Sequence, residues 1–163
     1  MDRFVSTFTF RLDGKGRVSI PASFRAVLAR DGFEGLFVHP TLDGPGLDAG
    51  GNALLREVDA VLSVLPPYSD ERDHLSTALF GSSEVLKLDG EGRVSLSDTL
   101  KAHSGIAESA TFVGVGHKFQ IWEPERFRAR LATARDRVRA LRQAGAFGIA
   151  ASSRNDVPGV PAA

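Results

Sequence analysis

The sequence predicts a mainly β fold with flanking helices, α+β by content, in which one half-domain occurs twice and a long helix follows. Three observations predict this. A nine-residue stretch at residues 12–20 recurs at residues 88–96, at an offset of 76 and with seven positions identical. Alternating apolar and polar residues flank each copy, as in half-buried strands. Segments with helical apolar periodicity lie between these strands. The offset is too long for a solenoid period, so it indicates two half-domains.

The repeated stretch is a tight turn that displays charge. It reads Asp-Gly-Lys-Gly-Arg from Asp13 to Arg17 and Asp-Gly-Glu-Gly-Arg from Asp89 to Arg93. Asp-Gly is a strong turn signal, two glycines within three positions permit positive φ, and the Asp can cap its own turn. Each arginine therefore follows a stiff loop and precedes a strand that fixes its direction. The alternative is a plain hairpin turn with a solvated arginine, but the matched duplication favours a shared function.

Length and composition restrict the class of protein. The chain has 163 residues, 42% hydrophobic, which is enough for one compact domain or two intertwined halves. It has no cysteine, which excludes disulfides, thiol nucleophiles and cysteine-ligated zinc. No apolar run approaches the length of a membrane span and no signal-peptide pattern is present, so we expect a cytoplasmic protein that does not bind a membrane.

Charge is balanced overall but unevenly distributed. The 20 basic and 20 acidic residues give a net charge of zero, which predicts no bulk attraction to nucleic acid. Residues 1–30 carry a net +4, residues 31–80 a net −7, residues 81–123 a net −2 and residues 124–163 a net +5. Since salt screens charges beyond roughly 8 Å, only local fields act on a ligand. The basic first segment can meet an anion while the acidic middle faces elsewhere.

The first half-domain is predicted to contain three strands and a helix. Residues 4–11 are rich in aromatic and β-branched residues, and Phe8 and Phe10 share one face at period two, so we expect a strand. A second strand follows the turn through Ile20. A helix over residues 21–30 begins at a proline and ends at a glycine, and a short apolar strand over residues 36–39 completes the half.

Residues 41–52 are rich in glycine and resemble a phosphate-binding loop in composition. They lack the lysine and the Ser/Thr of a P-loop, so we predict a plain surface loop.

The acidic middle of the chain is predicted to be helical. Residues 53–65 carry apolar side chains at helical spacing, and two prolines follow. Ser69 caps a second helix with acidic residues in its first turn, and Gly81 ends it. We expect these helices to pack on the strands; the alternative is a surface for a partner protein.

The second half-domain repeats the plan of the first. Strands are predicted around Val85 and through Leu96, and a capped helix over residues 97–103 ends at Gly105. A hairpin over residues 112–122 closes this half.

A long helix is predicted from Pro124 to about Gln143. Seven arginines surround one apolar face, formed by Phe127, Leu131, Ala134, Val138 and Leu141. The arginine-rich side is either a solvated face, a contact with the acidic middle of a neighbouring subunit, or an accessory DNA contact. Residues 144–163 have little to bury and are predicted to be a disordered tail.

Three separated motifs resemble the MraZ family of bacterial transcriptional regulators. They are Phe-Thr-Phe-Arg-Leu-Asp-Gly-Lys-Gly-Arg-Val-Ser-Ile-Pro-Ala-Ser-Phe-Arg at 8–25, the second copy of the turn, and Val-Gly-Val-Gly-His-Lys-Phe-Gln-Ile-Trp-Glu-Pro at 113–124. The resemblance spans residues 1 to about 143. It implies a double-split, swapped-hairpin β-barrel of two pseudo-twofold SpoVT/AbrB-type repeats, at 4–48 and 81–124. A helical connector at 49–80, the helix at 124–143 and the tail at 144–163 complete the chain.

The resemblance also implies a function and a partner. It implies a homo-oligomeric ring, associated with the nucleoid, that binds direct repeats in promoter DNA of the cell-division and cell-wall gene cluster. The Asp-x-x-x-Arg motif of the family maps onto Asp13 with Arg17 and onto Asp89 with Arg93. We assign the aspartates the task of capping the turn or orienting the arginine. The candidate DNA-binding residues are Arg11, Asp13, Lys15, Arg17, Arg25, Lys87, Asp89 and Arg93.

The second turn departs from the first. Glu91 stands where the first turn has Lys15, and a carboxylate there repels phosphate. The first turn is therefore the stronger candidate for DNA contact.

Catalysis is not predicted, and neither is a cofactor, a metal or a small-molecule substrate. The four histidines lack metal-ligand spacing, and no nucleophile motif or paired-carboxylate site is visible. The remaining alternative is a protein-interaction module, antitoxin-like or an assembly protein, on the same kind of barrel.

Overall fold

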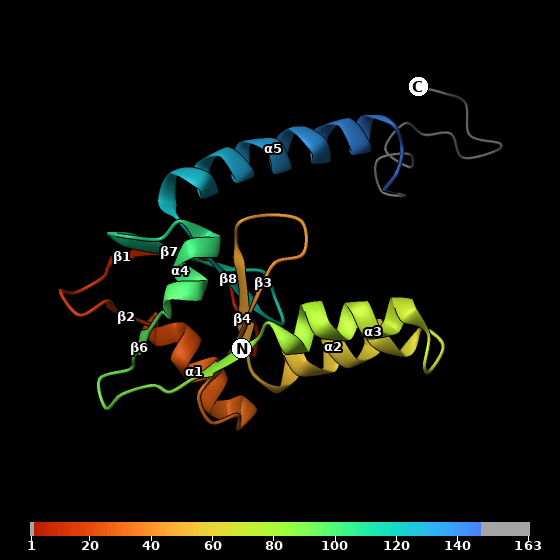
Figure 1. Cartoon of the computed structure of the whole chain (residues 1–163). Helices are drawn as coiled ribbons and strands as arrows, with labels where there is room; N and C mark the ends of the chain where they lie inside the picture. Colours follow the sequence, from red (N-terminus) through yellow and green to blue (C-terminus); the bar gives the residue numbers. More distant parts are fainter. Residues whose placement is uncertain (1, 148–163) are drawn as a thin grey trace. The chain divides into compact units, whose positions relative to one another are not determined.

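The computed structural model describes residues 2–147 (Figure 1). These residues belong to two compact units, Met1–Pro124 and Glu125–Ala163. Within the described residues, the first unit contains all the strands and most of the helices, and the second consists of a helix and its C-terminal cap. Residues 148–163 of the predicted tail lie outside the described residues.

Eight strands are present in the described residues, and they form two antiparallel sheets. A six-stranded sheet has the order β1-β7-β8-β4-β3-β5, and a two-stranded sheet pairs β2 with β6. The bounds are β1 Thr7–Arg11, β2 Arg17–Ser19, β3 Leu36–Pro40, β4 Leu47–Gly50, β5 Glu84–Leu86, β6 Arg93–Ser95, β7 Ser109–Gly114 and β8 Phe119–Trp122.

The helices occur close to where periodicity and caps predict them. They are α1 Ala22–Asp31, α2 Asn52–Ser63, α3 Asp70–Ser76 with the π-helical turn η1 Thr77–Gly81, α4 Asp98–Ser104 and α5 Pro124–Gln143. The hydroxyl of Ser69 accepts a hydrogen bond from the amide of Arg72 and so caps α3. Gly32 and Gly105 end α1 and α4 in the left-handed conformation, which glycine adopts without steric cost. The mixed α+β class is confirmed.

The strand pairing relates the two halves by a local twofold. β2 and β6 pair in the register Arg17↔Ser95, Val18↔Val94 and Ser19↔Arg93, so each half supplies the same residues in opposite directions. β4 and β8 pair in the same symmetric way around Asp48↔Gln120. The halves also exchange strands, because β1 of the first pairs with β7 of the second, and β5 of the second with β3 of the first.

No closed barrel is found among residues 2–147. β1 and β5 are the edge strands of the six-stranded sheet, and β2 with β6 forms a sheet of its own. The first strand is also shorter than predicted, because Ser6 has a φ of 78° and separates Phe4 from β1. Phe4 instead makes an isolated bridge with Gly116.

The prediction of a plain surface loop at residues 41–52 is wrong in its second half. Residues Leu47–Gly50 form β4, which is buried along its length between β3 and β8. Its small and polar residues have low strand propensity, so no local pattern indicates a strand. Tertiary contacts explain why β4 forms. The carboxylate of Asp48 accepts a hydrogen bond from Gln120, and Gly46 lies against the Trp122 ring, where a Cβ on Gly46 would come within 2.6 Å of Trp122 Cε2.

Two apolar clusters hold the first unit together. The larger lies between α1, α4 and the sheets and includes Phe24, Phe112 and Phe119. In the smaller, Leu54, Val58 and Leu62 of α2 pack with other apolar residues that include Phe37 of β3 and Leu79 of η1. The acidic middle therefore packs on the sheet through one face of α2, as expected.

Gly114 is a position where the fold leaves no space for a side chain. A Cβ there would lie 2.4 Å from the carbonyl carbon of Phe4 and 2.4 Å from the amide nitrogen of Val5, both backbone atoms that cannot rotate away. We expect Gly114→Ala to lower the free energy of unfolding by about 1–3 kcal/mol, measured by urea denaturation. Gly90→Ala is the matched control, because nothing lies within 4 Å of its Cβ position. Equal midpoints for the two variants would contradict this packing.

Candidate nucleic-acid interface

The first turn is held together by hydrogen bonds that one carboxylate accepts. Asp13 Oδ1 accepts from the backbone amides of Lys15 and Arg17, both at 2.9 Å, and Oδ2 accepts from Arg17 Nε at 2.7 Å. The amide of Asp13 donates to the carbonyl of Arg17 at 2.8 Å, which closes the loop. Gly16 has a φ of 76°. Asp13 therefore both caps the turn and orients the arginine.

The second turn has the same geometry. Asp89 Oδ1 accepts from the amides of Glu91 and Arg93 at 2.9 Å, and Oδ2 accepts from Arg93 Nε at 2.9 Å. Gly92, like its counterpart, has a φ of 76°. The identical residues of the repeat thus produce the same local structure twice.

Both aspartates are held in the ionised form. The backbone amide of Arg17 is the main cause that lowers the pKa of Asp13 to about 2, with further contributions from the Arg17 side chain and the Lys15 amide. The pKa of Asp89 is lowered chiefly by the amide of Arg93. Hydrogen bonds to a carboxylate favour its charged form, so each Asp–Arg pair is intact at neutral pH.

The titration of Asp13 gives a test of this geometry. Since the pKa of Asp13 is lower in the folded state, its contribution to stability is complete above the unfolded pKa of about 3.9 and is lost as the pH falls through about 2. We expect the carboxyl carbon of Asp13 to titrate near 2 in an NMR pH series. An apparent pKa near 3.9 would show that the amides of the turn do not hold the carboxylate in solution.

The two turns lie together on one side of the first unit (Figure 1). The β2·β6 pairing joins the strands that follow them, and Arg93 Nη1 lies 3.7 Å from Asp13 Oδ2. Arg25 of α1 reaches across to the second turn, where Nη1 donates to the carbonyl of Glu91 at 3.3 Å. The structure therefore brings Asp13, Arg17, Arg25, Asp89 and Arg93 into one cluster.

The arginines of the two turns differ in their surroundings. Arg17 pairs with Asp13 and with no other carboxylate among residues 2–147. Arg93 lies within ion-pair distance of three carboxylates, those of Asp89, Glu91 at 3.6 Å and Asp13. These contacts, the hydrogen bond to Asp89 first, raise the pKa of Arg93. The second turn, with Asp89, Glu91 and Arg93, thus carries a net charge of −1, while Lys15 and Arg17 leave the first turn with a net charge of +1.

Arg25 occupies a more enclosed place than the sequence indicates. Its side chain covers Gly92, where a Cβ would come within 2.5 Å of Arg25 Cδ, and its Nε has no hydrogen-bond partner among the described residues.

The residue of the second half that corresponds to Arg25 is Lys101, which was not among the site residues predicted from the sequence. Lys101 of α4 places Nζ 3.5 Å from the Cβ position of Gly16, and the offset of 76 relates it to Arg25. The repeat offset of 76 residues is therefore the sequence signal that could have identified Lys101 as a site residue.

The two remaining candidates lie on the segments that lead into the turns. Arg11 is the exposed last residue of β1, opposite Ser109, and Lys87 is exposed directly after β5. The structure does not bring them into the hydrogen-bonded cluster.

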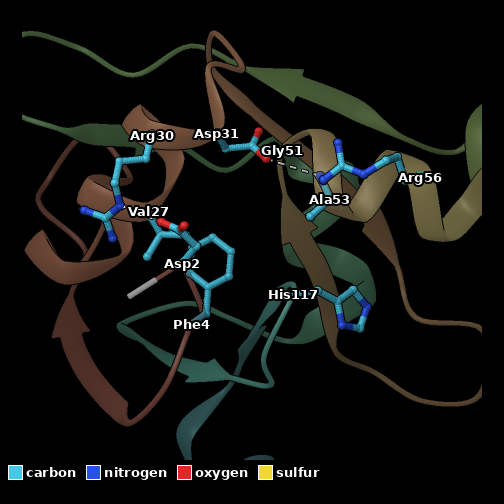
Figure 2. Close-up of a pocket in the computed structure, with 9 residues that line it drawn as sticks. All are labelled: Asp2, Phe4, Val27, Arg30, Asp31, Gly51, Ala53, Arg56 and His117. Atoms are coloured by element: carbon cyan, nitrogen blue, oxygen red, sulfur yellow. Dashed lines mark hydrogen bonds and ion pairs between the residues drawn. The ribbon is translucent and has the colours of Figure 1, made fainter.

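A cavity of about 310 Å³ lies apart from the turns (Figure 2). Much of its charge is already paired, because Arg30 Nε bonds Asp2 Oδ1 at 2.7 Å and the Asp31 carboxylate accepts from the amide of Asn52 at 2.7 Å, at the start of α2. Its lining residues are Asp2, Phe4, Val27, Arg30, Asp31, Gly51, Ala53, Arg56 and His117.

Among the described residues, no group of three or more His, Asp or Glu is arranged to hold a metal ion. None of the helices in that part of the chain is both long and apolar enough to cross a membrane.

Comparison with known proteins agrees with the motifs. The family model described as "MraZ protein, putative antitoxin-like" matches residues 79–144. A protein of Beijerinckia indica subsp. indica named "Transcriptional regulator MraZ" is 66% identical over 143 residues, covering 88% of this chain and 87% of its own. Proteins of the same name from Xanthobacter autotrophicus and Parvibaculum lavamentivorans are 64% and 41% identical over 144 residues, covering 88% of this chain and 92% and 89% of theirs. At these identities and this coverage, the chain belongs to the MraZ family.

Proposed function

We propose that this chain is a transcriptional regulator that binds double-stranded DNA in a sequence-specific manner through the first turn. The observation that carries the proposal is the Asp13–Arg17 pair. Asp13 holds Arg17 Nε at 2.7 Å, while the terminal nitrogens of the guanidinium have no partner among the described residues. The side chain is one-third exposed, so a ligand can reach these nitrogens. The regulators named in the comparison support the same role.

The chemistry of the turn suits recognition of DNA. Lys and Arg contacts to phosphates position a protein on the duplex, and an arginine that bonds the O6 and N7 of guanine reads the sequence. Because Asp13 already fixes Arg17, little conformational entropy is lost when the arginine binds. We assign base reading to Arg17 and phosphate contacts to Lys15 and Arg11.

The second turn has a supporting role in this proposal. Asp89 orients Arg93 as Asp13 orients Arg17, but Glu91 repels phosphate and neutralises part of Arg93. Lys87 and Arg25 then supply the positive charge on this side, and Arg25 also supports the turn from α1.

We further propose that several subunits act together. One turn presents few charges, so useful affinity requires several turns on one DNA. A homo-oligomeric ring on promoter direct repeats meets this requirement, and the promoter of the cell-division and cell-wall gene cluster is the first candidate. We place such a protein in the cytoplasm, associated with the nucleoid. The symmetric strand pairing supports two SpoVT/AbrB-type repeats, 4–48 and 81–124, that exchange hairpins and are joined by the connector 49–80.

Lys15 is expected to contribute to DNA affinity but not to sequence preference. Its side chain is exposed and has no partner within residues 2–147, so it is free to contact phosphate. We expect Lys15→Ala to weaken binding about equally on all sequences and to reduce the slope of log K against log salt by about 1 per turn. Affinity measured over a series of salt concentrations, on a preferred and a scrambled duplex, checks this. A loss confined to the preferred duplex would instead make Lys15 a base reader.

The proposal as a whole is tested by selecting bound sequences from random DNA, alongside the particle mass in solution. Short boxes repeated at regular spacing are the expected result. Failure to enrich any sequence over several rounds would sink the proposal.

A second candidate function is a protein-interaction module. The family description contains the words "antitoxin-like", and the middle of the chain is acidic. Co-purification of a stoichiometric small protein, together with no measurable DNA binding, would favour this candidate over the first.

A further inference from the structure

The two-stranded ribbon of β2 and β6 carries two exposed serines between the turns (Figure 1). In each strand the middle valine, Val18 or Val94, is buried, and the serine that follows it, Ser19 or Ser95, is exposed. Successive side chains of a strand point to opposite faces, so each serine shares the outer face with the arginine two residues before it. Among residues 2–147, neither serine hydroxyl has a hydrogen-bond partner. The outer face of the ribbon therefore offers two unused hydrogen-bond donors.

The register of the ribbon places each serine beside the arginine of the other half. Ser95 lies directly opposite Arg17, and Ser19 lies directly opposite Arg93. Residues directly opposite in an antiparallel pair have Cβ atoms about 5 Å apart, whereas residues two apart on one strand are separated by about 7 Å. Of the two serines, the one nearer to Arg17 thus comes from the second half, although Ser19 is closer to Arg17 in the sequence.

The two serines differ in their electrostatic surroundings. Ser95 lies next to Arg17, which pairs with one carboxylate among the described residues. Ser19 lies next to Arg93, which is within ion-pair distance of three carboxylates. Carboxylates repel the phosphates of DNA, because both are negatively charged. A phosphate therefore approaches Ser95 more easily than Ser19.

We propose that Ser95 completes the reading site of the first turn, as a donor to a DNA phosphate beside the base that Arg17 contacts. Serine is one of the side chains that bond phosphate oxygens in protein–DNA complexes. The major groove admits a two-stranded ribbon, so the outer face of β2 and β6 can lie against the DNA while Arg17 reaches a base edge. The site is then composite: the first half supplies the arginine and the second half supplies the hydroxyl. This inference rests on the proposed function, because it names a further residue of the same DNA site.

Threonine and valine at position 95 separate the effect of the hydroxyl from that of side-chain bulk. The two side chains have nearly the same shape and both suit a strand, but only threonine keeps the hydroxyl. On a duplex selected from random DNA, Ser95→Thr should bind within about twofold of the wild type, and Ser95→Val about 3- to 10-fold more weakly for each turn engaged. Fluorescence anisotropy at one fixed salt concentration measures both affinities, and urea denaturation establishes that both variants are folded.

Ser19→Val is the matched control, because the repeat places Ser19 at the equivalent position of the other half. Its affinity should fall by less than about twofold, since the three carboxylates around Arg93 keep phosphates away from Ser19. Equal losses for Ser19→Val and Ser95→Val, or a larger loss for Ser19→Val, would overturn the assignment of the phosphate contact to Ser95.

Duplexes with a single neutral methylphosphonate identify the phosphate that Ser95 contacts. At that phosphate, the replacement should weaken binding of the wild type and bring it to the same affinity as Ser95→Val, because the variant has no hydrogen bond to lose there. If the wild type and Ser95→Val differ by the same factor on every such duplex, Ser95 does not bind a phosphate and the inference is wrong.

The same measurements distinguish failure of this inference from failure of the proposed function. If the wild type binds the selected duplex but Ser95→Thr and Ser95→Val bind it equally, the hydroxyl has no part in recognition and the DNA proposal stands. If the wild type enriches no sequence from random DNA, both proposals are overturned.

Discussion

Replacing Arg17 by alanine is expected to weaken specific DNA binding by about 1–3 kcal/mol for each turn engaged, which is about 5- to 150-fold. The reason is geometric. Asp13 holds Arg17 Nε at 2.7 Å and leaves the terminal nitrogens of the guanidinium for a bidentate contact with a base edge. A fluorescence anisotropy titration at one fixed salt concentration, on a duplex selected from random DNA, measures the change. The loss should be much smaller on a scrambled duplex.

Arg93→Ala is the matched control for this prediction. Arg93 makes the equivalent bond to Asp89 at 2.9 Å, but it also lies close to Glu91 and Asp13. Because three carboxylates surround it, its removal should cost less DNA affinity than removal of Arg17. Circular dichroism and urea unfolding establish that both variants are folded. If both lose the same affinity, the second turn contacts DNA as strongly as the first; if Arg17→Ala loses none, Arg17 does not read DNA.

Loss of the Asp48 carboxylate is expected to have the largest effect on stability. Asp48 is 7% exposed and lies where β4 and β8 of the two halves pair. Its Oδ1 accepts from Gln120 Nε2 at 2.9 Å, and its Oδ2 lies 3.4 Å from Lys118 Nζ. In Asp48→Ala, Lys118 remains mostly buried, and its only nearby carboxylate among the described residues is that of Glu57, whose Oε2 lies 3.3 Å from Lys118 Nζ. We expect the free energy of unfolding to fall by about 2–4 kcal/mol, measured by urea denaturation.

Two further variants separate the ion pair from other causes. Asp43 is exposed on the loop before β4, so Asp43→Ala should change stability by less than about 0.5 kcal/mol. The double variant Asp48→Leu with Lys118→Met removes both charges, and it should recover most of the loss, because no buried charge is left without its partner. If Asp48→Ala is as stable as Asp43→Ala, the carboxylate does not join the two halves energetically.

Much of the fold could be predicted because it depends on local chemistry. Ser69, Gly32 and Gly105 cap their helices as their residue types indicate, and α5 spans Pro124–Gln143 as its periodicity predicts. β4 could not be predicted in this way. Its stability depends on hydrogen bonds with β3 and β8 and on the bonds of Asp48 to residues about 70 positions later, which leave no periodic signal in residues 41–52.

The candidate site also has a part that depends on local sequence and a part that depends on long-range contacts. The sequence by itself determined two turns of the same geometry, because Asp, Gly and Arg at these spacings can close their own hydrogen bonds within five residues, and it also shows that the turns differ in charge, because Glu91 stands in place of Lys15. Only the tertiary structure brought Arg93 near Asp13, Arg25 over Gly92 and Lys101 beside Gly16. These contacts join opposite halves of the chain. They depend on which distant segments the antiparallel β2·β6 pairing brings together, and local sequence carries no record of that.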